Sequence, residues 1–387
     1  MSILGNRVLR KEDSRFLLGA GEYVENLPLE GALDVTFVRS LMAHARIDVD
    51  GSAATEAGAQ VLTGGDVDVG PFGPPPLPGL EKRMGRPLVA RDTVRFVGDI
   101  AAIVLAEGRT ESADAAEHVF VDYDPLPVVV DPAEAVKDEV LLYPEVETNV
   151  AARFADERDE ALFEGCDVVA SGTVTSQRMA PCPLEPRSAA AVVGEDGRTT
   201  AWLSTQTPHQ DRMVLAMTLG MDPSELRVVA PDVGGGFGAK MLCVEEILVV
   251  WLARSLGRPV RWTESRSESM VALGHGRAQK AEFTIGGTKD GKVLAYRLSV
   301  LQDCGAYPML GAFLPHLTHL MASGVYDIPR IEFESVSVVT NTTPTTAFRG
   351  AGRPEASQAI ERAFDAFAAE AGLDPAEVRR KNFIAND

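Results

Sequence analysis

The chain has 387 residues, which is long enough for two or three domains. Its 56 acidic residues against 37 basic ones give a net charge of −19, which argues against nucleic-acid binding because that needs a basic footprint. No apolar run reaches the roughly 18–20 residues that a membrane span needs, and the start of the chain lacks the apolar core of a signal peptide. We therefore expect a cytoplasmic protein without a membrane span.

The four cysteines include no closely spaced pair, which argues against a disulfide framework, a zinc knuckle or an iron–sulfur site. We expect scattered, buried thiols in a reducing compartment at Cys166, Cys182, Cys243 and Cys304. His316 and His319 are three residues apart, but no acidic residue near them completes a metal site, so local packing is the favoured interpretation.

The first third of the chain predicts one α+β domain over residues 20–128, after a locally basic N-terminal extension over residues 1–19. Runs of apolar residues predict its strands, and Gly98-Asp99 is expected to turn the chain between two of them. Residues 69–79 are too rich in Pro and Gly for regular structure and predict a loop. The expected strands are 32–40, 94–97, 100–106 and 119–123, with a short helix at 111–118.

Residues 129–165 are acidic and predict a connector that wraps over the surface, and a second domain is expected over residues 166–387. Thr207-Pro208 predicts a helix start, because Thr can cap, Pro suits the first helical position and Gln210 can complete a capping box. The expected strands are 168–174, 189–193, 200–205, 226–230, 259–263, 281–285 and 293–300, of which the last two form a hairpin; further helices are expected at 244–253, at 355–371 and from 374.

The stretch 231–240 contains four glycines in five positions. Glycine adds no side chain to a core and loses the most entropy on ordering, so packing does not account for them. The stretch lies between an apolar run typical of a buried strand and another typical of a buried helix. In that setting, backbone N–H groups can converge on an anion or on a polar cofactor.

These residues alone leave several interpretations open. Gly234, Gly236 and Ala239 match a variant of the dinucleotide-binding fingerprint, although they lie in a region of hairpins. A phosphate-binding P-loop would share Lys240 but needs a Ser or Thr where Met241 stands. The stretch could also be a turn that lets two elements pack closely.

A second Gly-rich approach to a helix, residues 346–355, favours another interpretation. Arg349 and Arg353 could fork onto phosphate or carbonyl oxygens there. Two such stretches in one domain predict two helix N-termini aimed at one large anionic ligand.

The two Gly-rich stretches taken together resemble one known protein family. VGGGFGAK, followed about a hundred residues later by AFRGAGRPE, resembles the molybdenum-carrying large subunit of the xanthine dehydrogenase, aldehyde oxidase and carbon monoxide dehydrogenase family, and most closely its form II carbon monoxide dehydrogenase-like branch. Similar motifs lie at 8–24, 96–102, 121–127, 184–187 and 204–207, so the resemblance covers essentially the whole chain. It implies an α+β fold, with an α/β hammerhead domain followed by the first molybdopterin-binding domain.

In that family a pterin dithiolene holds the molybdenum, and the protein supplies hydrogen bonds and shape. The resemblance therefore implies no direct metal ligand from this chain. It implies that Gln206 hydrogen-bonds a ligand of the molybdenum. The residues expected to bind the cofactor are Gln206, Gly235, Gly236, Phe237 and Gly238, with Ala347, Phe348, Arg349 and Gly350 from the second stretch.

Departures from the family pattern bear on the substrate. Relatives that oxidise purines carry Glu where Met241 stands and an aromatic residue where Ala351 stands. We therefore expect Met241 and Ala351 to line the substrate pocket, and we do not expect a purine substrate. Copper-containing carbon monoxide dehydrogenases carry Cys where Gly350 stands, which disfavours oxidation of CO.

The family's large subunit is about twice as long as this chain, and its second half brings another molybdopterin-binding domain and the Glu that acts as general base. The expected function is accordingly half of a molybdenum hydroxylase, without its own catalytic residue. It would oxidise an aldehyde or N-heteroaromatic C–H with water as the oxygen source. The implied partners are the C-terminal half of the large subunit, an iron–sulfur small subunit with [2Fe–2S] centres and an FAD medium subunit.

The cofactor expected on this chain is molybdenum–molybdopterin, with or without a cytosine dinucleotide. The alternative hypothesis from a different class is a catalytically inactive remnant that acts only as a folding or assembly partner.

Overall fold

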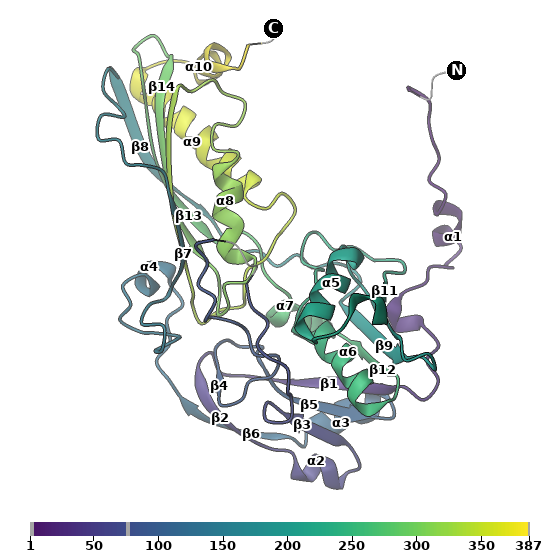
Figure 1. Ribbon diagram of the computed structural model, residues 1–387. Helices are drawn as coiled ribbons and strands as arrows, with labels where there is room; N and C mark the ends of the chain where they lie inside the picture. The colour runs from purple at the N-terminus through teal and green to yellow at the C-terminus, as the bar shows by residue number, and fades with distance from the viewer. Residues whose placement is uncertain (1–3, 75–77, 386–387) are drawn as a thin grey trace.

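The computed structural model describes residues 4–74 and 78–385, which form three β-sheets with helices packed against them (Figure 1). Residues 75–77 of the expected Pro-rich loop, the first three residues of the expected N-terminal extension and the last two of the expected second domain lie outside the described residues. The N-terminal segment runs away from the body in Figure 1 and is tied to it by Arg15, whose Nη2 donates to Asp232 Oδ1 at 2.6 Å.

A seven-stranded sheet joins the two predicted domains. Strand β1 of the first pairs in parallel with β12 of the second, in the register Leu33 to Val260 and Val35 to Trp262. The strand order is β11-β10-β9-β12-β1-β5-β3. The strands are β1 (Leu33–Arg39), β3 (Gln60–Thr63), β5 (Ile100–Ala106), β9 (Ser188–Val193), β10 (Thr199–Leu203), β11 (Leu226–Val229) and β12 (Val260–Thr263).

Helix α6 (Val244–Leu256) packs against this sheet and supplies much of its core. Its sequence is apolar on nearly all sides because the helix is buried on nearly all sides. It ends at Gly257, whose φ of 61° is the left-handed conformation that commonly closes helices. Strand β5 is an unbroken apolar run for a similar reason, since it lies between β1 and β3 with both faces covered.

A five-stranded sheet of order β7-β15-β14-β13-β8 forms the other end of the molecule, with α8 and α9 on one face (Figure 1). The hairpin expected within 281–300 is confirmed as β13 and β14. Helix α9 lays its apolar stripe on this sheet. The elements are β7 (Val150–Ala155), β8 (Val168–Ser176), β13 (Gln279–Gly287), β14 (Val293–Asp303), β15 (Arg330–Val338), α8 (Leu314–His319) and α9 (Arg353–Ala371).

The third sheet has three strands in the order β4-β2-β6, which are β2 (Ala45–Asp50), β4 (Thr93–Val94) and β6 (Phe120–Pro125). The remaining helices are α1 (Asp13–Leu17), α2 (Ser52–Glu56), α3 (Arg109–Ala116), α4 (Pro132–Ala135), α5 (Pro208–Thr218), α7 (Arg266–Ala272) and α10 (Pro375–Asn382), with 3₁₀ turns at Val24–Asn26, Pro223–Glu225 and Gly311–Phe313.

Two sequence-based expectations about the first half are wrong. The strands expected at 94–97 and 100–106 do not pair with each other: β4 stops at Val94 and pairs with β2, whereas β5 pairs with β1 and β3. The buried Asp99 carboxylate redirects the chain between them, because it accepts the Arg95 N–H and the Tyr307 hydroxyl at 3.2 and 2.7 Å.

The acidic segment 129–165 is more than a surface connector. It contains α4, and its strand β7 pairs with β15 in the five-stranded sheet. Leu142, Tyr143 and Val146 are buried in a core cluster with residues near 304–312 and 338–339. The acidic composition concealed these few apolar anchors. The domain boundaries themselves stay predictions.

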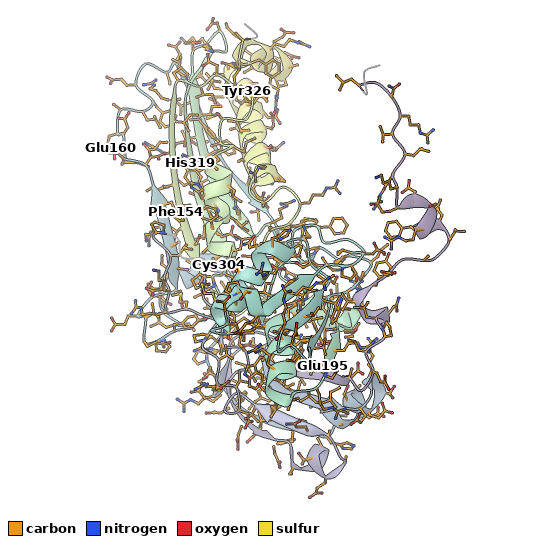
Figure 2. All side chains as sticks on the ribbon, turned by 45° about the vertical axis from the view of Figure 1, so that its right-hand side comes forward. Phe154, Glu160, Glu195, Cys304, His319 and Tyr326 are labelled. Atoms are coloured by element: carbon orange, nitrogen blue, oxygen red, sulfur yellow. The ribbon has the colours of Figure 1, made fainter. Side chains whose placement is uncertain are left out.

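The scattered cysteines are free thiols, but only Cys304 is fully buried, and Cys182 is exposed. Figure 2 shows Cys304 in the interior, near the junction of the two ends of the molecule. His319 stacks on Phe333 with ring centroids 4.4 Å apart. The part of the chain that the structure describes holds no cluster of three or more His, Cys, Asp or Glu suited to a metal ion.

Candidate active site

The glycine stretch forms a loop between β11 and α6 with an unusual backbone. Gly235 and Gly238 have φ values of 96° and 100°, which favour glycine. Phe237 between them has a φ of 54°, although it is not glycine, and its side chain is 39% exposed. A non-glycine residue in this conformation stores strain, and such residues concentrate at ligand sites.

Gln206 is fixed against this loop. Its Oε1 accepts the Gly238 N–H at 2.8 Å, and its own N–H donates to the Lys240 carbonyl at 3.0 Å. A Cβ atom on Gly236 would lie 2.2 Å from Gln206 Oε1, so any other residue there would displace the Gln206 side chain. Gln206 is exposed, and its Nε2 has no hydrogen-bond partner in the described structure. One end of the amide is therefore anchored while the other can donate to a ligand.

The second predicted stretch lies directly beside the first. The Arg349 N–H donates to the Phe237 carbonyl at 2.7 Å. A Cβ on Gly238 would lie 2.8 Å from the Ala347 carbonyl oxygen, so the two backbones approach as closely as glycine allows. The structure thus brings together all nine residues expected to bind the cofactor: Gln206, Gly235, Gly236, Phe237, Gly238, Ala347, Phe348, Arg349 and Gly350.

Arg277 holds the second stretch in place, a role that the sequence did not indicate. Its guanidinium donates to the carbonyls of Phe348 and Arg349 at 2.7 and 2.8 Å and lies 4.9 Å from the centre of the Phe348 ring. Arg277 and Ala278 have φ values of 67° and 63°. Together with Phe237 they place three non-glycine residues at positive φ around the two cofactor stretches.

Beneath the glycine loop lies a buried ion pair. Lys240 Nζ donates to Glu185 Oε2 at 2.6 Å, and the same oxygen accepts the Gly234 N–H at 2.7 Å and the Ser204 hydroxyl at 2.9 Å. Burial lowers the pKa of Lys240, although Glu185 opposes that shift. Since its ammonium is already paired, Lys240 does not serve as the phosphate-binding lysine of a P-loop.

The dinucleotide fingerprint is also not supported. That motif needs the glycines at the start of a helix, but Gly238 lies six residues before Val244, where α6 begins. The N-terminus of α6 is instead closed by a capping box in which Glu246 accepts the Cys243 N–H at 3.0 Å. The expectation that this stretch aims a helix N-terminus at the ligand is wrong.

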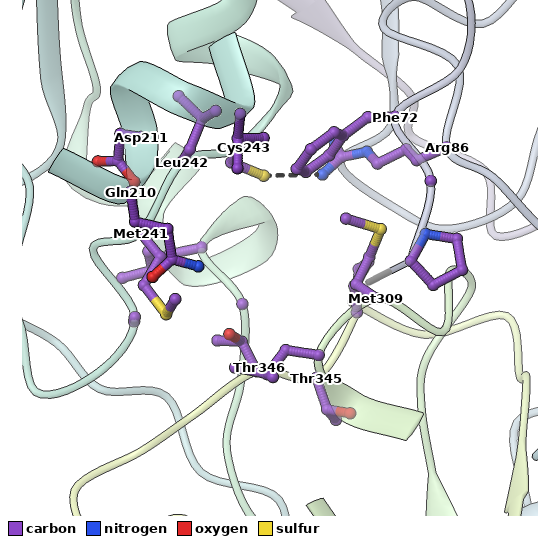
Figure 3. A pocket seen from close by; sticks show the side chains of 18 of the residues that line it. Phe72, Arg86, Gln210, Asp211, Met241, Leu242, Cys243, Met309, Thr345 and Thr346 are labelled. Carbon is purple, nitrogen blue, oxygen red and sulfur yellow. Dashed lines mark hydrogen bonds between the residues drawn. The ribbon is translucent and has the colours of Figure 1, made fainter. Parts of the chain in front are cut away.

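A cavity of about 250 Å³ opens beside the glycine loop. Figure 3 shows Gln210 and Met241 on one side of it and Phe72 and Met309 on the other. Its lining is mostly apolar and comes from both predicted domains, since Phe72 and Arg86 belong to the first. Met241 lines the cavity, whereas Ala351 does not: Ala351 lies in the turn before α9 with a φ of 41°.

One face of α5 forms a wall of this cavity. Gln210, Val214 and Met217 are spaced by four and three residues and therefore share that face. The expected capping box at Thr207 is absent, because the Thr207 hydroxyl donates to Asp211 Oδ1 at 2.9 Å and not to the backbone. Helical spacing from Gln206 could have indicated Gln210, but nothing in the sequence connects Phe72 or Met309 to this site.

Comparison with known proteins agrees with this geometry. The molybdopterin cofactor-binding domain model matches residues 142–383, and the α/β hammerhead domain model of aldehyde oxidase and xanthine dehydrogenase matches residues 18–127. Together with the loop geometry, these matches define a molybdopterin-binding protein. The chain belongs to the xanthine dehydrogenase and aldehyde oxidase family of molybdenum hydroxylase large subunits.

The nicotine 6-hydroxylase large subunit of Paenarthrobacter nicotinovorans is 34% identical over 99% of this chain and 48% of its own length. The crystal structure of quinoline 2-oxidoreductase from Pseudomonas putida 86 superposes with a TM-score of 0.94 at 35% identity, covering 98% of this chain and 50% of that one. The chain therefore spans about half the length of these relatives.

A third relative is closer in length to this chain. The nicotinate dehydrogenase large molybdopterin subunit of Eubacterium barkeri is 26% identical over 98% of this chain and 89% of its own length. No helix in the described ranges has the length and the hydropathy to cross a membrane.

Proposed function

We propose that this chain supplies the molybdopterin-facing half of a molybdenum hydroxylase active site. The observation that carries the proposal is the geometry of Gln206, whose Oε1 is anchored to Gly238 while Nε2 is left to donate. The donors offered around the loop are amides, which suit the anionic oxygen and sulfur atoms of a molybdopterin better than a bare metal ion. When bound, that cofactor supplies the oxidation of a C–H bond with water as the oxygen source.

The chain's own residues would then hold and orient the reactants. Gln206 Nε2 would donate a hydrogen bond to the cofactor, and the backbone of residues 235–238 and 347–350 would hold it. The apolar walls around Met241 exclude water from the substrate. Among the described residues of the cavity lining, the one carboxylate is Asp211, and both of its oxygens accept threonine hydroxyls. We therefore assign the general base to polypeptide outside these residues.

N-heteroaromatic rings are the substrates that we favour over aldehydes. Two similar proteins are named for nicotine and for quinoline, both of which contain such a ring. Gly350 offers no thiolate to copper, so oxidation of CO is not proposed.

The partners that we propose are the second molybdopterin-binding domain, a [2Fe–2S] subunit and an FAD subunit. The Eubacterium barkeri relative, described as a molybdopterin subunit and similar in length, supports a large subunit divided between chains. The free thiols of all four cysteines suit a reducing compartment, and on that ground we place the assembly in the cytoplasm. Whether the pterin carries cytosine can be read by mass spectrometry of the extracted cofactor.

Co-expression tests the proposal. The chain is produced alone and together with the half of the quinoline 2-oxidoreductase chain that it does not match and with the proposed [2Fe–2S] and FAD subunits, and molybdenum is measured by mass spectrometry. We expect stoichiometric molybdenum and oxidation of quinoline with an artificial electron acceptor only in the complex. Turnover by the chain alone would contradict the proposal that it supplies only half of the active site. A complex without molybdenum would favour the alternative hypothesis of a catalytically inactive assembly partner.

A further inference from the structure

We propose that Gln210 is the residue that selects the substrate, and that the cavity takes a neutral, flat, two-ring heteroaromatic molecule hydrogen-bonded to its side-chain amide. This inference rests on the proposed function for the identity of the cavity as the substrate site. It goes further in naming the charge, the size and the recognition contact of the substrate.

The position of Gln210 connects the cavity to the cofactor loop. Gln206 precedes α5, and Gln210 lies four residues further, on the helix face that lines the cavity. Figure 3 shows the Gln210 amide directed into the same space as the Met241 side chain. Since α5 is a rigid element, a ring held by Gln210 would have a fixed orientation relative to the loop that Gln206 touches.

The Gln210 amide is available for a ligand. The structure gives its oxygen and nitrogen no hydrogen bond to any described residue, and Gln210 is exposed and lines the cavity. A primary amide both accepts and donates, so it can pair with a ring nitrogen, a ring N–H or a carbonyl oxygen. It carries no charge with which to balance an ionic substrate.

The size and surface of the cavity suit a fused ring. Its volume is about 250 Å³, whereas a cavity of roughly 150 Å³ takes up benzene. Across the cavity from Gln210 lie Phe72 and Met309 (Figure 3), and the apolar side chains of Leu273 and Leu310 also line it. Methionine side chains adapt to aromatic faces and make favourable sulfur contacts with them.

The charged groups near the cavity are already paired within the protein. Asp211 accepts the hydroxyls of Thr205 and Thr207. Arg187 donates to Glu245 at 3.0 Å and to Glu264 at 2.6 Å. A charged substrate would therefore lose its hydration without gaining a counter-ion.

Arg86 is the remaining cation of the lining and is the main alternative. Its Nη1 donates to Cys243 Sγ at 3.4 Å, its Nε lies 3.9 Å from Asp99 Oδ1, and its guanidinium lies over the rings of Phe96 and Tyr307. The Nε and Nη2 atoms have no hydrogen-bond partner in the described structure, but they also have almost no accessible surface. They therefore do not face the space that a substrate would occupy.

Equilibrium dialysis of the reduced holo-complex tests the inference, because a reduced enzyme binds its substrate without oxidising it. The probes are quinoline and quinoline-6-carboxylate. We expect quinoline to bind at least tenfold more tightly than its carboxylate. The Gln210→Leu variant should weaken quinoline binding roughly three- to tenfold, as loss of one neutral hydrogen bond does. The matched control is His209→Leu, a polar-to-leucine change on α5 outside the cavity lining, which should leave binding unchanged.

Three results would overturn the inference: unchanged quinoline binding in Gln210→Leu, no quinoline binding by the wild-type complex, or tighter binding of the carboxylate. Loss of carboxylate binding in Arg86→Met would then identify an anion site at Arg86. Dialysis is independent of turnover. Binding that depends on Gln210 in a complex that oxidises nothing would therefore contradict the proposed function while leaving this contact established.

Discussion

Among the glycines of the cofactor loop, Gly236 leaves the least room for an added Cβ atom. Replacing it with alanine would place a Cβ 2.2 Å from Gln206 Oε1, so the Gln206 side chain must move and its bond to Gly238 must break. We expect Gly236→Ala to fold but to lose most of its molybdenum in the assembled complex. Metal content by mass spectrometry and thermal unfolding by circular dichroism measure the two effects separately.

The matched control is Gly70→Ala, since a Cβ at Gly70 meets nothing within 4 Å and its φ is not positive. This variant should retain both its molybdenum and its melting temperature. Full molybdenum in Gly236→Ala would show that the position of Gln206 is not needed for cofactor binding.

The Lys240–Glu185 pair provides a second test at the scale of single residues. Lys240 is 1% exposed, and removing its charge leaves the Glu185 carboxylate with only neutral donors. We expect Lys240→Met to lower the free energy of unfolding by about 3–5 kcal/mol, as for other broken buried pairs. Urea unfolding measures this change.

The double variant Glu185→Gln with Lys240→Met should recover part of that loss, because neither position of the pair then carries an unpaired charge. A double variant no more stable than Lys240→Met alone would mean that packing of the lysine stem, and not the charge of Glu185, accounts for the loss.

The sequence was informative about residues of the cofactor loop and less so about the residues that support them. Gln206 and the two Gly-rich stretches belong to local motifs, and the structure brings them together. Arg277 acts through contacts that depend on the fold, since it is 71 residues from Phe348. Such contacts leave no local pattern.

At the scale of elements, the start of α6 combines one arginine with three carboxylates. Arg187 lies within 4 Å of Glu245, Glu246 and Glu264. Burial alone would raise the pKa of Glu245, but Arg187 and Arg39 lower it well below its usual range. Glu246 is farther from Arg187, at 3.7 Å, and burial raises the pKa of Glu246 to about 7. We take Glu246 to be largely protonated below neutral pH despite that contact.

A pH-dependent stability follows. The unfolded Glu246 loses its proton near pH 4.5 and the folded one near pH 7, so increasing pH between these values destabilises the fold. Glu246→Gln keeps an acceptor for the Cys243 N–H but cannot ionise. We expect its free energy of unfolding relative to wild type to rise by on the order of 2–3 kcal/mol between pH 5 and pH 8.

Thermal unfolding at a series of pH values measures this difference. Glu195→Gln, at an exposed turn, is the matched control and should follow the wild type. A constant offset between Glu246→Gln and wild type across the range would show that Glu246 does not change ionisation there.

Elements were predictable where their pairing is local. The β13–β14 hairpin and helices α6 and α9 follow from turn residues and apolar patterns near them in the sequence. Strand β7 was missed because its partner β15 is about 180 residues away and its neighbourhood is acidic. The shared sheet was missed for the same reason, since Val35 pairs with Trp262.

For the whole molecule, that shared sheet predicts cooperative unfolding. Phe37 of β1 and Trp262 of β12 pack edge to face with centroids 5.4 Å apart, and both lie in one core cluster with α6. We expect the segments matched as a hammerhead and as a molybdopterin-binding domain to unfold in one calorimetric transition. Trp262→Ala should lower the unfolding free energy by about 3–5 kcal/mol and shift that transition as a unit.

Hydrogen exchange followed by mass spectrometry checks the same prediction locally. Protection of β5 should fall together with that of β9 in Trp262→Ala. Two separate transitions, with β5 keeping its protection, would mean that the domains unfold independently although they share a sheet.

The cavity has two kinds of wall, and they come from different parts of the chain. Gln210 and Met241 lie close in sequence to the cofactor loop, whereas Phe72 lies far from it in sequence, on a loop of the hammerhead segment. We therefore expect changes at Phe72 to alter the shape of the cavity, and with it the preferred substrate, with little effect on the glycine backbone around Gln206. Directed evolution of new substrate preferences can therefore begin at residues 72–74, which line the cavity but lie outside both cofactor stretches.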